Sequence, residues 1–165
     1  MTKLNSYLSL IRFYNPIGFW LLLWPGLWGL FLSDNFNIEN FTIVVLGSFL
    51  TRSLGCAIND FLDKDFDKSV ERTKNRPIAS KELSLSEAGI FIILIACFCI
   101  FLLMQTNLYT IKLVSYIAIP MIILYPLMKR FLAMPQLFLG ATFGLSLPIS
   151  YSIAESTLSL EVIFL

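Results

Sequence analysis

The chain has no histidine among its 165 residues, and only 14% of the residues are charged. Without histidine, a Ser–His or His–Asp mechanism is excluded, and so is a histidine-ligated metal. The three cysteines, Cys56, Cys97 and Cys99, show no metal-finger spacing, and we interpret them as small buried apolar residues. No basic field suits a nucleic acid, so we expect no such partner. Any chemistry must use carboxylates, cations and hydroxyls.

Apolar residues make up 57% of the chain and the mean hydropathy is +0.78, which is too high for a soluble domain of this length. Three uncharged stretches are each long enough to cross about 30 Å of hydrocarbon. They are residues 13–33, 88–111 and 131–154. Two more apolar stretches, 41–58 and 113–128, are interrupted by Arg52 and by prolines. The sequence predicts an all-α transmembrane bundle of about five helices, forming a single membrane domain over residues 1–165.

Positive charges collect in one set of connections between these stretches. Residues 60–87 contain six Lys or Arg residues, whereas the opposite connections contain only Lys112. The positive-inside rule makes residues 60–87 a cytoplasmic Asp-rich loop of a multi-pass protein, with the lipid bilayer as a partner and the bacterial inner membrane as the expected location. For the lysines of this loop, setting the topology is the favoured interpretation. The first apolar stretch is too long for a signal peptide, so we expect it to be retained.

Four of the eleven acidic residues lie between Asn59 and Asp67. On a helix, residues four apart share a face, so Asn59, Asp63 and Asp67 would line up while Asp60 would lie about 100° away. Such close carboxylates repel one another unless a hard dication intervenes. Mg²⁺ usually keeps positions for water and phosphate oxygens, so the segment predicts a Mg²⁺ site completed by a phosphate or diphosphate. The alternative is a solvated loop whose mixed charges keep two helices apart.

Several cations and one tyrosine accompany this acidic segment. Arg72 and Arg76 are again four residues apart, a turn or so further on, and arginine suits forked contacts with phosphate oxygens. Arg52 lies two helical turns deeper, where its guanidinium would bind an anionic group or would instead snorkel or form a buried pair. Tyr125 and Lys129 are also four apart, and they are either site residues or ordinary interfacial anchors at a kinked helix end.

These residues resemble the UbiA-type intramembrane aromatic prenyltransferases. The longest matching run is Asn59-Asp60-x-x-Asp63-x-x-Phe66-Asp67-x-x-Val70-x-Arg72-Thr73-x-x-Arg76-Pro77. Three shorter segments are similar to the 4-hydroxybenzoate polyprenyltransferases within that family. They are Asn15-Pro16-Ile17-Gly18, Tyr125-Pro126-x-x-Lys129-Arg130 and Pro135-Gln136-x-x-Leu139-Gly140.

The resemblance implies a helical enzyme that transfers a polyprenyl group from polyprenyl diphosphate to 4-hydroxybenzoate in ubiquinone biosynthesis, with Mg²⁺ as cofactor. By matching position, the catalytic and metal-binding residues would be Asn59, Asp63 and Asp67, with Asp60 as a further metal ligand. Four residues would contact the diphosphate: Arg72, Arg76, Tyr125 and Lys129. The aromatic acid's carboxylate would meet Arg52 and Arg130.

The chain departs from the family pattern in its later part. Family members carry a second Asp-rich motif and about nine spans, whereas the acidic residues after Asp67 form no comparable motif here. We therefore expect the chain to resemble only the first half of the family fold. Two alternatives follow from this. One is an inactive or partner-dependent half-protein, for which a separately encoded C-terminal half would be the partner. The other is a prenyltransferase for another acceptor, such as a naphthoate or a haem.

Overall fold

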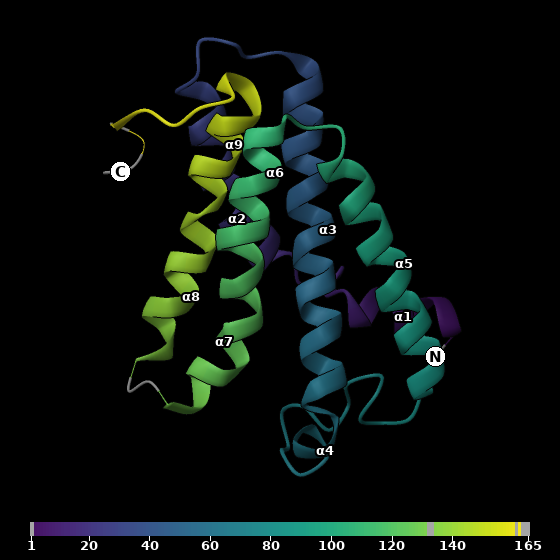
Figure 1. Cartoon of the computed structure of the whole chain (residues 1–165). Coiled ribbons are helices and arrows are strands. Elements are labelled where there is room, and N and C mark those ends of the chain that lie inside the picture. Colours follow the sequence, from purple (N-terminus) through teal and green to yellow (C-terminus); the bar gives the residue numbers. More distant parts are fainter. Residues whose placement is uncertain (1, 132–133, 161, 163–165) are drawn as a thin grey trace. The chain divides into compact units, whose positions relative to one another are not determined.

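The structure is a computed structural model that describes residues 2–131, 134–160 and 162 (Figure 1). The described residues form helices and turns without a strand, which confirms the all-α prediction. The elements are α1 (Lys3–Leu10), α2 (Ile17–Phe31), α3 (Ile38–Leu62), α4 (Lys64–Asp67), α5 (Leu85–Leu103), α6 (Leu108–Leu113), the π-helix η1 (Val114–Ala118), α7 (Ile119–Phe131), α8 (Pro135–Gly144) and α9 (Ser146–Glu155).

Apolar helices lie at all five predicted spans. Four helical stretches are long and apolar enough to cross a bilayer: Ile38–Leu62, Leu85–Leu103, Leu108–Tyr125 and Gln136–Glu155. The remaining predicted span, residues 13–33, contains α2, which has 15 residues and is therefore about 22 Å long. α3 exceeds its predicted stretch at both ends and contains Arg52 within its length.

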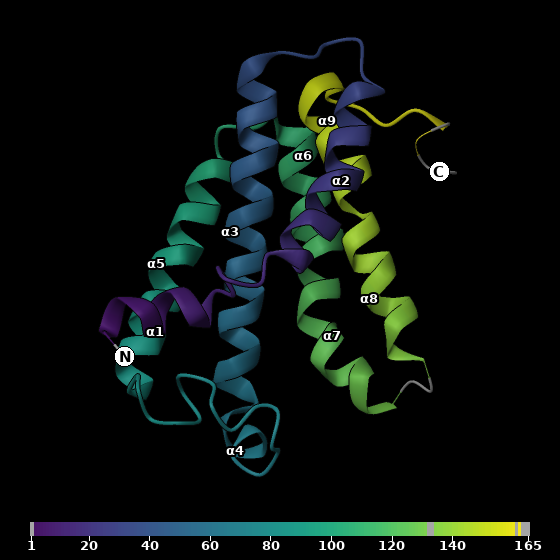
Figure 2. The ribbon, with the colours of Figure 1, turned by 180° about the vertical axis from the view of Figure 1, so that it is seen from behind.

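The chain divides into two compact units, which are described separately. The first unit combines Met1–Gly18 with Leu50–Ile100. Its core brings together residues from α1, α3, α5 and the loop before α5: Leu10, Ala57, Ala88, Ile78 and Leu83. Figure 2 shows α1 beside the first turns of α5 in this unit. Since Leu83 and Ile78 are buried here, the charged loop is fixed to the helices through its apolar residues.

A capping box begins α5. Ser84 accepts the backbone N–H of Glu87 at its Oγ (3.2 Å), and the Glu87 carboxylate accepts the backbone N–H of Ser84 (2.9 Å). Lys3 of α1 also forms an ion pair with Glu87. These contacts anchor the end of the loop and the N-terminal helix to the same turn of α5.

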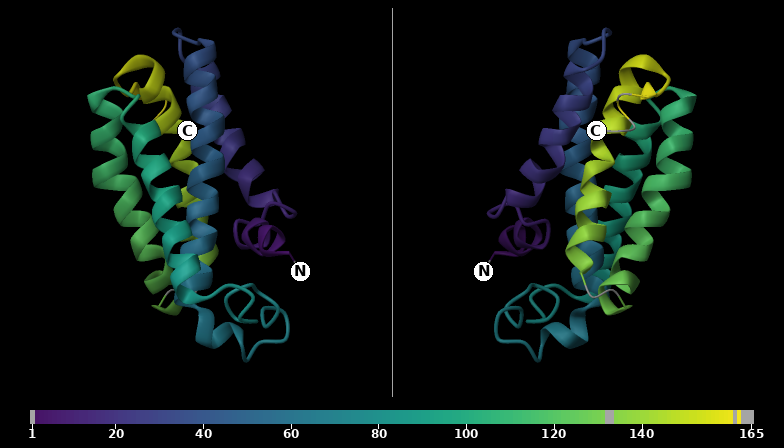
Figure 3. Two further views of the ribbon diagram at one scale, coloured as in Figure 1. Left: turned by 90° about the vertical axis from the view of Figure 1, so that its right-hand side faces the viewer. Right: turned by 90° about the vertical axis from the view of Figure 1, so that its left-hand side faces the viewer.

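The second unit combines Phe19–Phe49 with Phe101–Leu165. Its chain runs through α6, η1 and α7 and returns through α8 and α9, so that α8 packs against α7 and α9 packs against α6 (Figure 3). Asn107 donates from Nδ2 to the carbonyl of Ser152 (2.6 Å), and the hydroxyls of Thr110 and Ser152 are 2.8 Å apart. These buried polar groups satisfy one another where two apolar helices meet.

Gly29 allows α2 to approach α9 closely. A Cβ at Gly29 would overlap the carbonyl oxygen of Leu147 and lie 2.9 Å from its carbonyl carbon. Nearby, Ser146 donates its hydroxyl to the carbonyl of Leu22 (2.8 Å). The second unit therefore packs small residues against backbone, as membrane helices commonly do.

Candidate functional site

The predicted line of ligands crosses the end of α3 and does not follow one unbroken helix. α3 ends at Leu62, and Asp63 has φ −90° and ψ 5° before the short α4 begins. Asp63 still donates its N–H to the carbonyl of Asn59 (2.9 Å), and Asp67 donates to Asp63 (2.8 Å). The four-residue spacing of the three side chains is kept, but the prediction that a continuous helix carries it was wrong.

Arg76 joins two of the acidic side chains. Its Nη1 lies 2.7 Å from Oδ2 of Asp67 and 3.0 Å from Oδ1 of Asp60. The Asp67 side chain is 9% exposed and the Asp60 side chain is 1% exposed. A guanidinium between two buried carboxylates offsets their mutual repulsion. Arg76 therefore occupies the acidic segment itself.

Arg12 is the second cation on Asp60. Its Nη2 lies 2.8 Å from Oδ1 and 3.1 Å from Oδ2 of Asp60. From the sequence Arg12 received no role in the site, because no local pattern pairs it with a residue 48 positions later. The one signal was its place as the last charge before a long apolar stretch.

The predicted continuation of the helical spacing to Arg72 and Arg76 was wrong. Residues 68–83 form turns and bends, in which Thr73 donates its N–H to the carbonyl of Val70 (2.9 Å) and Arg76 donates to Thr73 (3.0 Å). Arg72 is exposed, whereas Arg76 is half-buried. The turns bring the Arg76 side chain to Asp67, although no helix joins the two residues. Figure 3 shows this segment and α4 as a loop beyond the end of α3.

Arg52 lies against the first turn of α2. A Cβ at Gly18 would overlap the Arg52 guanidinium, with Cζ and Nη2 only 2.6 Å away. Gly18 is buried, so the space that its missing side chain leaves is filled by the Arg52 head group. The half-buried Arg52 thus has its head group against the first turn of α2, and its predicted position facing the bundle interior stays a prediction. Sequence analysis named both residues but did not predict that one makes room for the other.

The remaining predicted site residues belong to the second unit. Tyr125 is half-buried in α7. Lys129 and Arg130 lie in the last turns of the same helix, and their side chains lie outside the described residues. Their predicted contacts with the diphosphate and the aromatic acid therefore stay predictions.

The donors at the end of α3 fit a partly protein-ligated Mg²⁺. The described residues contain no group of three or more His, Cys, Asp or Glu side chains that would hold a metal ion by themselves. Mg²⁺ usually takes one or two carboxylates and fills its other positions with water and substrate phosphate oxygens. Asp63 and Asp67, with the amide of Asn59, match that smaller set of hard oxygen donors.

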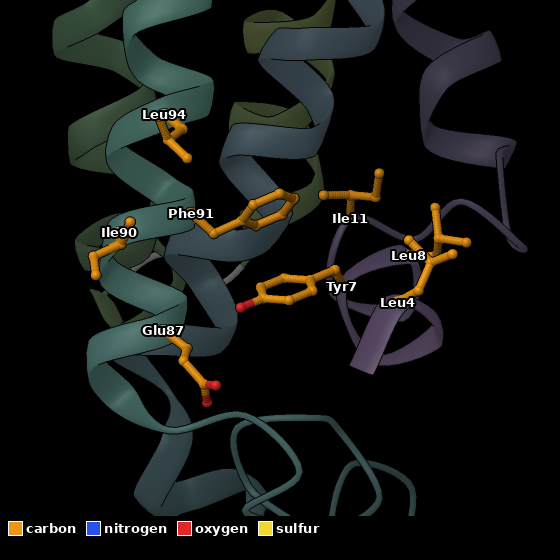
Figure 4. A pocket seen from close by; sticks show the side chains of 8 residues that line it. All are labelled: Leu4, Tyr7, Leu8, Ile11, Glu87, Ile90, Phe91 and Leu94. Carbon is orange, nitrogen blue, oxygen red and sulfur yellow. The ribbon is translucent and has the colours of Figure 1, made fainter. Parts of the chain in front are cut away.

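An apolar pocket of about 440 Å³ lies between α1 and α5 in the first unit (Figure 4). Tyr7 and Phe91 line it, and their ring centroids are 4.8 Å apart. Glu87 supplies the one carboxylate of the lining, and that carboxylate is already paired with Lys3. The pocket contains none of the residues predicted to bind the diphosphate or the aromatic acid.

Taken together, the apolar helices and the loop of acidic and basic residues at the end of one of them define an integral membrane protein. A family model described as the UbiA prenyltransferase family matches residues 22–165. The chain belongs to this family. This confirms the resemblance drawn from the Asp-rich motif.

Curated relatives of similar sequence carry one name. The 4-hydroxybenzoate octaprenyltransferase of Polynucleobacter asymbioticus is 42% identical over 161 residues, and that of Histophilus somni (strain 2336) is 45% identical over 163 residues. Each alignment covers 96% of this chain and 56% of the relative. The chain therefore spans about half the length of the curated relatives it matches.

Two solved structures have a similar fold. One, reported on digeranylgeranylglyceryl phosphate synthase in membranes, has a TM-score of 0.75 and 26% identity, and the match covers 91% of this chain and 53% of that one. The other is a UbiA homologue from Archaeoglobus fulgidus bound to GPP and Mg²⁺, with a TM-score of 0.74 and 19% identity over 95% of this chain and 56% of that one. The helical fold is thus that of UbiA proteins.

Proposed function

We propose that this chain provides the diphosphate-binding part of a membrane prenyltransferase that joins a polyprenyl group to 4-hydroxybenzoate in ubiquinone biosynthesis. The observation that carries the proposal is the placement of Asp63, Asp67 and Arg76 at one end of α3. The names of the relatives that are 42% and 45% identical support the choice of donor and acceptor.

In this proposal Asp63 and Asp67 hold Mg²⁺, and Asn59 supports them. Bound Mg²⁺ would neutralise charge that develops on the leaving diphosphate. The Archaeoglobus fulgidus homologue bound to GPP and Mg²⁺ supports this assignment. Arg76, which already contacts Asp67, and the exposed Arg72 of the same loop supply guanidinium groups for the diphosphate oxygens. Tyr125 and Lys129 remain proposed diphosphate contacts.

The acceptor would be oriented through its carboxylate. Arg52 is the proposed partner because its guanidinium lies against the buried Gly18, and Arg130 is a second proposed partner. The C1–O bond of the donor breaks, and the diphosphate leaves with the electron pair. The ring carbon ortho to the hydroxyl then bonds to C1 and loses its proton, which gives a 3-polyprenyl-4-hydroxybenzoate. The apolar helix faces would exclude water from the allylic cation.

The positive charges of residues 60–87 support a cytoplasmic position of this loop in a bacterial inner membrane. A cysteine placed at Lys74, in a variant whose native cysteines are replaced by serine, tests this. Lys74 is exposed, so a membrane-impermeant reagent should label it only from the cytoplasmic side. Labelling from the outside alone would reverse the orientation.

Binding and turnover test the function separately. The purified chain in detergent should bind geranyl diphosphate when Mg²⁺ is present, and Asp63→Ala should weaken this binding at least about tenfold, since a metal ligand is lost. Membranes that contain the chain should convert labelled 4-hydroxybenzoate and polyprenyl diphosphate into a prenylated product. If the wild-type chain neither binds nor yields product above the Asp63→Ala control, the proposal is rejected. Product that forms only with a naphthoate or a haem would change the acceptor.

A second candidate is a half-protein that works with a separately encoded C-terminal partner. Each alignment covers 56% of the relative, so the relatives hold a part that this chain does not match. It predicts that the chain binds geranyl diphosphate with Mg²⁺ but gives product only when the C-terminal part of a relative is co-expressed. Turnover by the chain alone would exclude this dependence.

A further inference from the structure

The Asp60 carboxylate is enclosed by guanidinium groups. Oδ1 is contacted by Arg12 (2.8 Å) and Arg76 (3.0 Å), and Oδ2 by Arg12 (3.1 Å). With its side chain 1% exposed, Asp60 offers little access to a Mg²⁺ ion that keeps its waters. Asp63 is only half-buried, and Asp67 is more exposed than Asp60, with a side chain 9% exposed and one guanidinium contact.

The backbone of Arg12 is held in a conformation that usually belongs to glycine. Arg12 has φ 60° and follows the C-terminus of α1. Its N–H bonds to the carbonyl of Ser9 (3.0 Å), and the N–H of Phe13 bonds to the carbonyl of Leu8 (2.9 Å). These two bonds form a Schellman motif, in which the left-handed position is usually glycine. An arginine there costs about 1–2 kcal/mol of backbone strain, so its side chain must do something that glycine would not.

Arg12, Asp60, Arg76 and Asp67 form a chain of alternating charges with no net charge. Arg76 is shared between the two aspartates, and Arg12 balances one of them. Without Arg12, the buried Asp60 would keep Arg76 as its one ion-pair partner among the described residues and would draw it away from Asp67, because an unpaired buried charge is costly. Without Asp60, Arg76 would lose the contact that holds it from the α3 side.

We propose that Arg12 and Asp60 are positioning residues that hold Arg76 at the diphosphate site, and that Asp60 is not a metal ligand. This inference rests on the proposed function for the identity of the diphosphate. It changes the sequence-based role of Asp60 and adds Arg12 to the site.

Arg12→Gly is the sharpest variant, because glycine favours the left-handed backbone and preserves the cap of α1. Asp60→Asn keeps the shape of the second side chain and removes its charge. Each variant should weaken Mg²⁺-dependent geranyl diphosphate binding about tenfold, and the double variant should be no weaker than the worse single one. Lys74→Gln is the matched control: it removes an exposed cation of the same loop that pairs with exposed Glu71, and it should leave the affinity unchanged.

Metal binding in the absence of diphosphate separates positioning from ligation. Mn²⁺ serves as the probe, with electron paramagnetic resonance as the readout. Asp63→Asn should weaken Mn²⁺ binding, whereas Asp60→Asn and Arg12→Gly should not. Loss of Mn²⁺ in Asp60→Asn equal to that in Asp63→Asn would overturn the proposal. Unchanged diphosphate affinity in Arg12→Gly would also overturn it, since Arg12 would then serve only the cap.

Thermal unfolding keeps the pair testable even if the wild-type chain binds neither Mn²⁺ nor geranyl diphosphate, a result that would count against the proposed function itself. Asp60→Asn should lower Tm in the wild-type chain and shift it by less than half as much in the Arg12→Gly background. Equal shifts in both backgrounds would reject the coupling of the two side chains. If the Asp60→Asn protein does not accumulate, the geranyl diphosphate affinity of Arg12→Gly is compared with that of Lys74→Gln, and equal affinities would reject the role of Arg12.

Discussion

The two units of this chain satisfy their polar groups in different ways. Every ion pair described above belongs to the first unit, where Arg12, Asp60, Arg76 and Asp67 form a continuous charged series. The second unit uses neutral groups, as between Thr110 and Ser152, or backbone, as where the Glu155 carboxylate accepts the N–H groups of Asp34 (2.8 Å) and Asn35 (3.1 Å). Neutral groups hold apolar helices together, whereas paired charges at a helix end can exchange partners with an anionic ligand.

The largest effect is expected from Asp67→Asn, which removes one negative charge from the charged series of the first unit. The variant loses a proposed metal donor and the charge that holds Arg76, so Mg²⁺-dependent affinity for geranyl diphosphate should fall about 10- to 100-fold. Isothermal titration calorimetry measures this. Asp65→Asn is the control from the same segment because Asp65 is exposed. Equal losses in both variants would show that the loop acts only through its net charge.

Gly18→Ala should produce a smaller and more selective loss. The added Cβ would overlap the Arg52 guanidinium, which can move because it is the far end of a flexible side chain. We expect affinity for 4-hydroxybenzoate to fall about tenfold, as for a lost charge-assisted contact, with geranyl diphosphate affinity unchanged. Gly55→Ala in α3 is the matched control, since in the described part of the chain nothing beyond its chain neighbours and the adjacent backbone of its own helix lies within 4 Å of its added Cβ. Unchanged acceptor binding in Gly18→Ala would remove Arg52 from the acceptor site.

Thr110→Val should act on stability alone, since it breaks the neutral contact with Ser152 in the second unit. We expect the free energy of unfolding to fall by about 0.6–1.7 kcal/mol, the range for hydrogen bonds between membrane helices. Denaturation in mixed micelles measures it. Thr142→Val is the comparison, because that hydroxyl donates within its own helix, to the carbonyl of Phe138. A change in diphosphate affinity with Thr110→Val would contradict the expectation that this contact contributes to stability alone.

Lys68→Gln should have the smallest effect. Lys68 donates a hydrogen bond to Asp65 (2.9 Å), and this contact lowers the pKa of the Asp65 carboxyl from 3.8. A carboxyl with a lowered folded-state pKa stabilises the fold above about pH 4 and loses that contribution as the pH falls through the folded value. Lys68→Gln should therefore slightly flatten the stability profile below pH 4. An unchanged profile would mean that this exposed pair contributes nothing measurable.

Much of the fold could be predicted because its signals are local. Length and apolarity located the spans, and the spacing from Arg52 to Asn59 correctly placed both on one helix. The helix end at Asp63 and the turns that carry Arg76 back to Asp67 depend on burial of Ile78 and Leu83, which no periodicity encodes.

Two contacts between residues far apart in the sequence could not be predicted for the same reason. The contact of Arg12 with Asp60 spans 48 positions, and the seat of Arg52 at Gly18 spans 34. Gly18 was named as part of a motif, but the sequence does not show which group fills the space that its missing side chain leaves. Both pairs become visible only when α1, α2 and α3 are placed in three dimensions.

The π-helix η1 has a consequence for every residue after it in α7. A π-turn adds one residue to the helical ladder, which rotates the following side chains by about 100° relative to an uninterrupted α-helix. Pro120 is the second residue after η1, and its ring nitrogen cannot contribute an N–H to the ladder. Tyr125 thus faces a direction that counting from Leu108 in steps of 3.6 would miss. Removing one residue from Val114–Ala118 would swing that phenol to a neighbouring side of the helix without changing a single site residue.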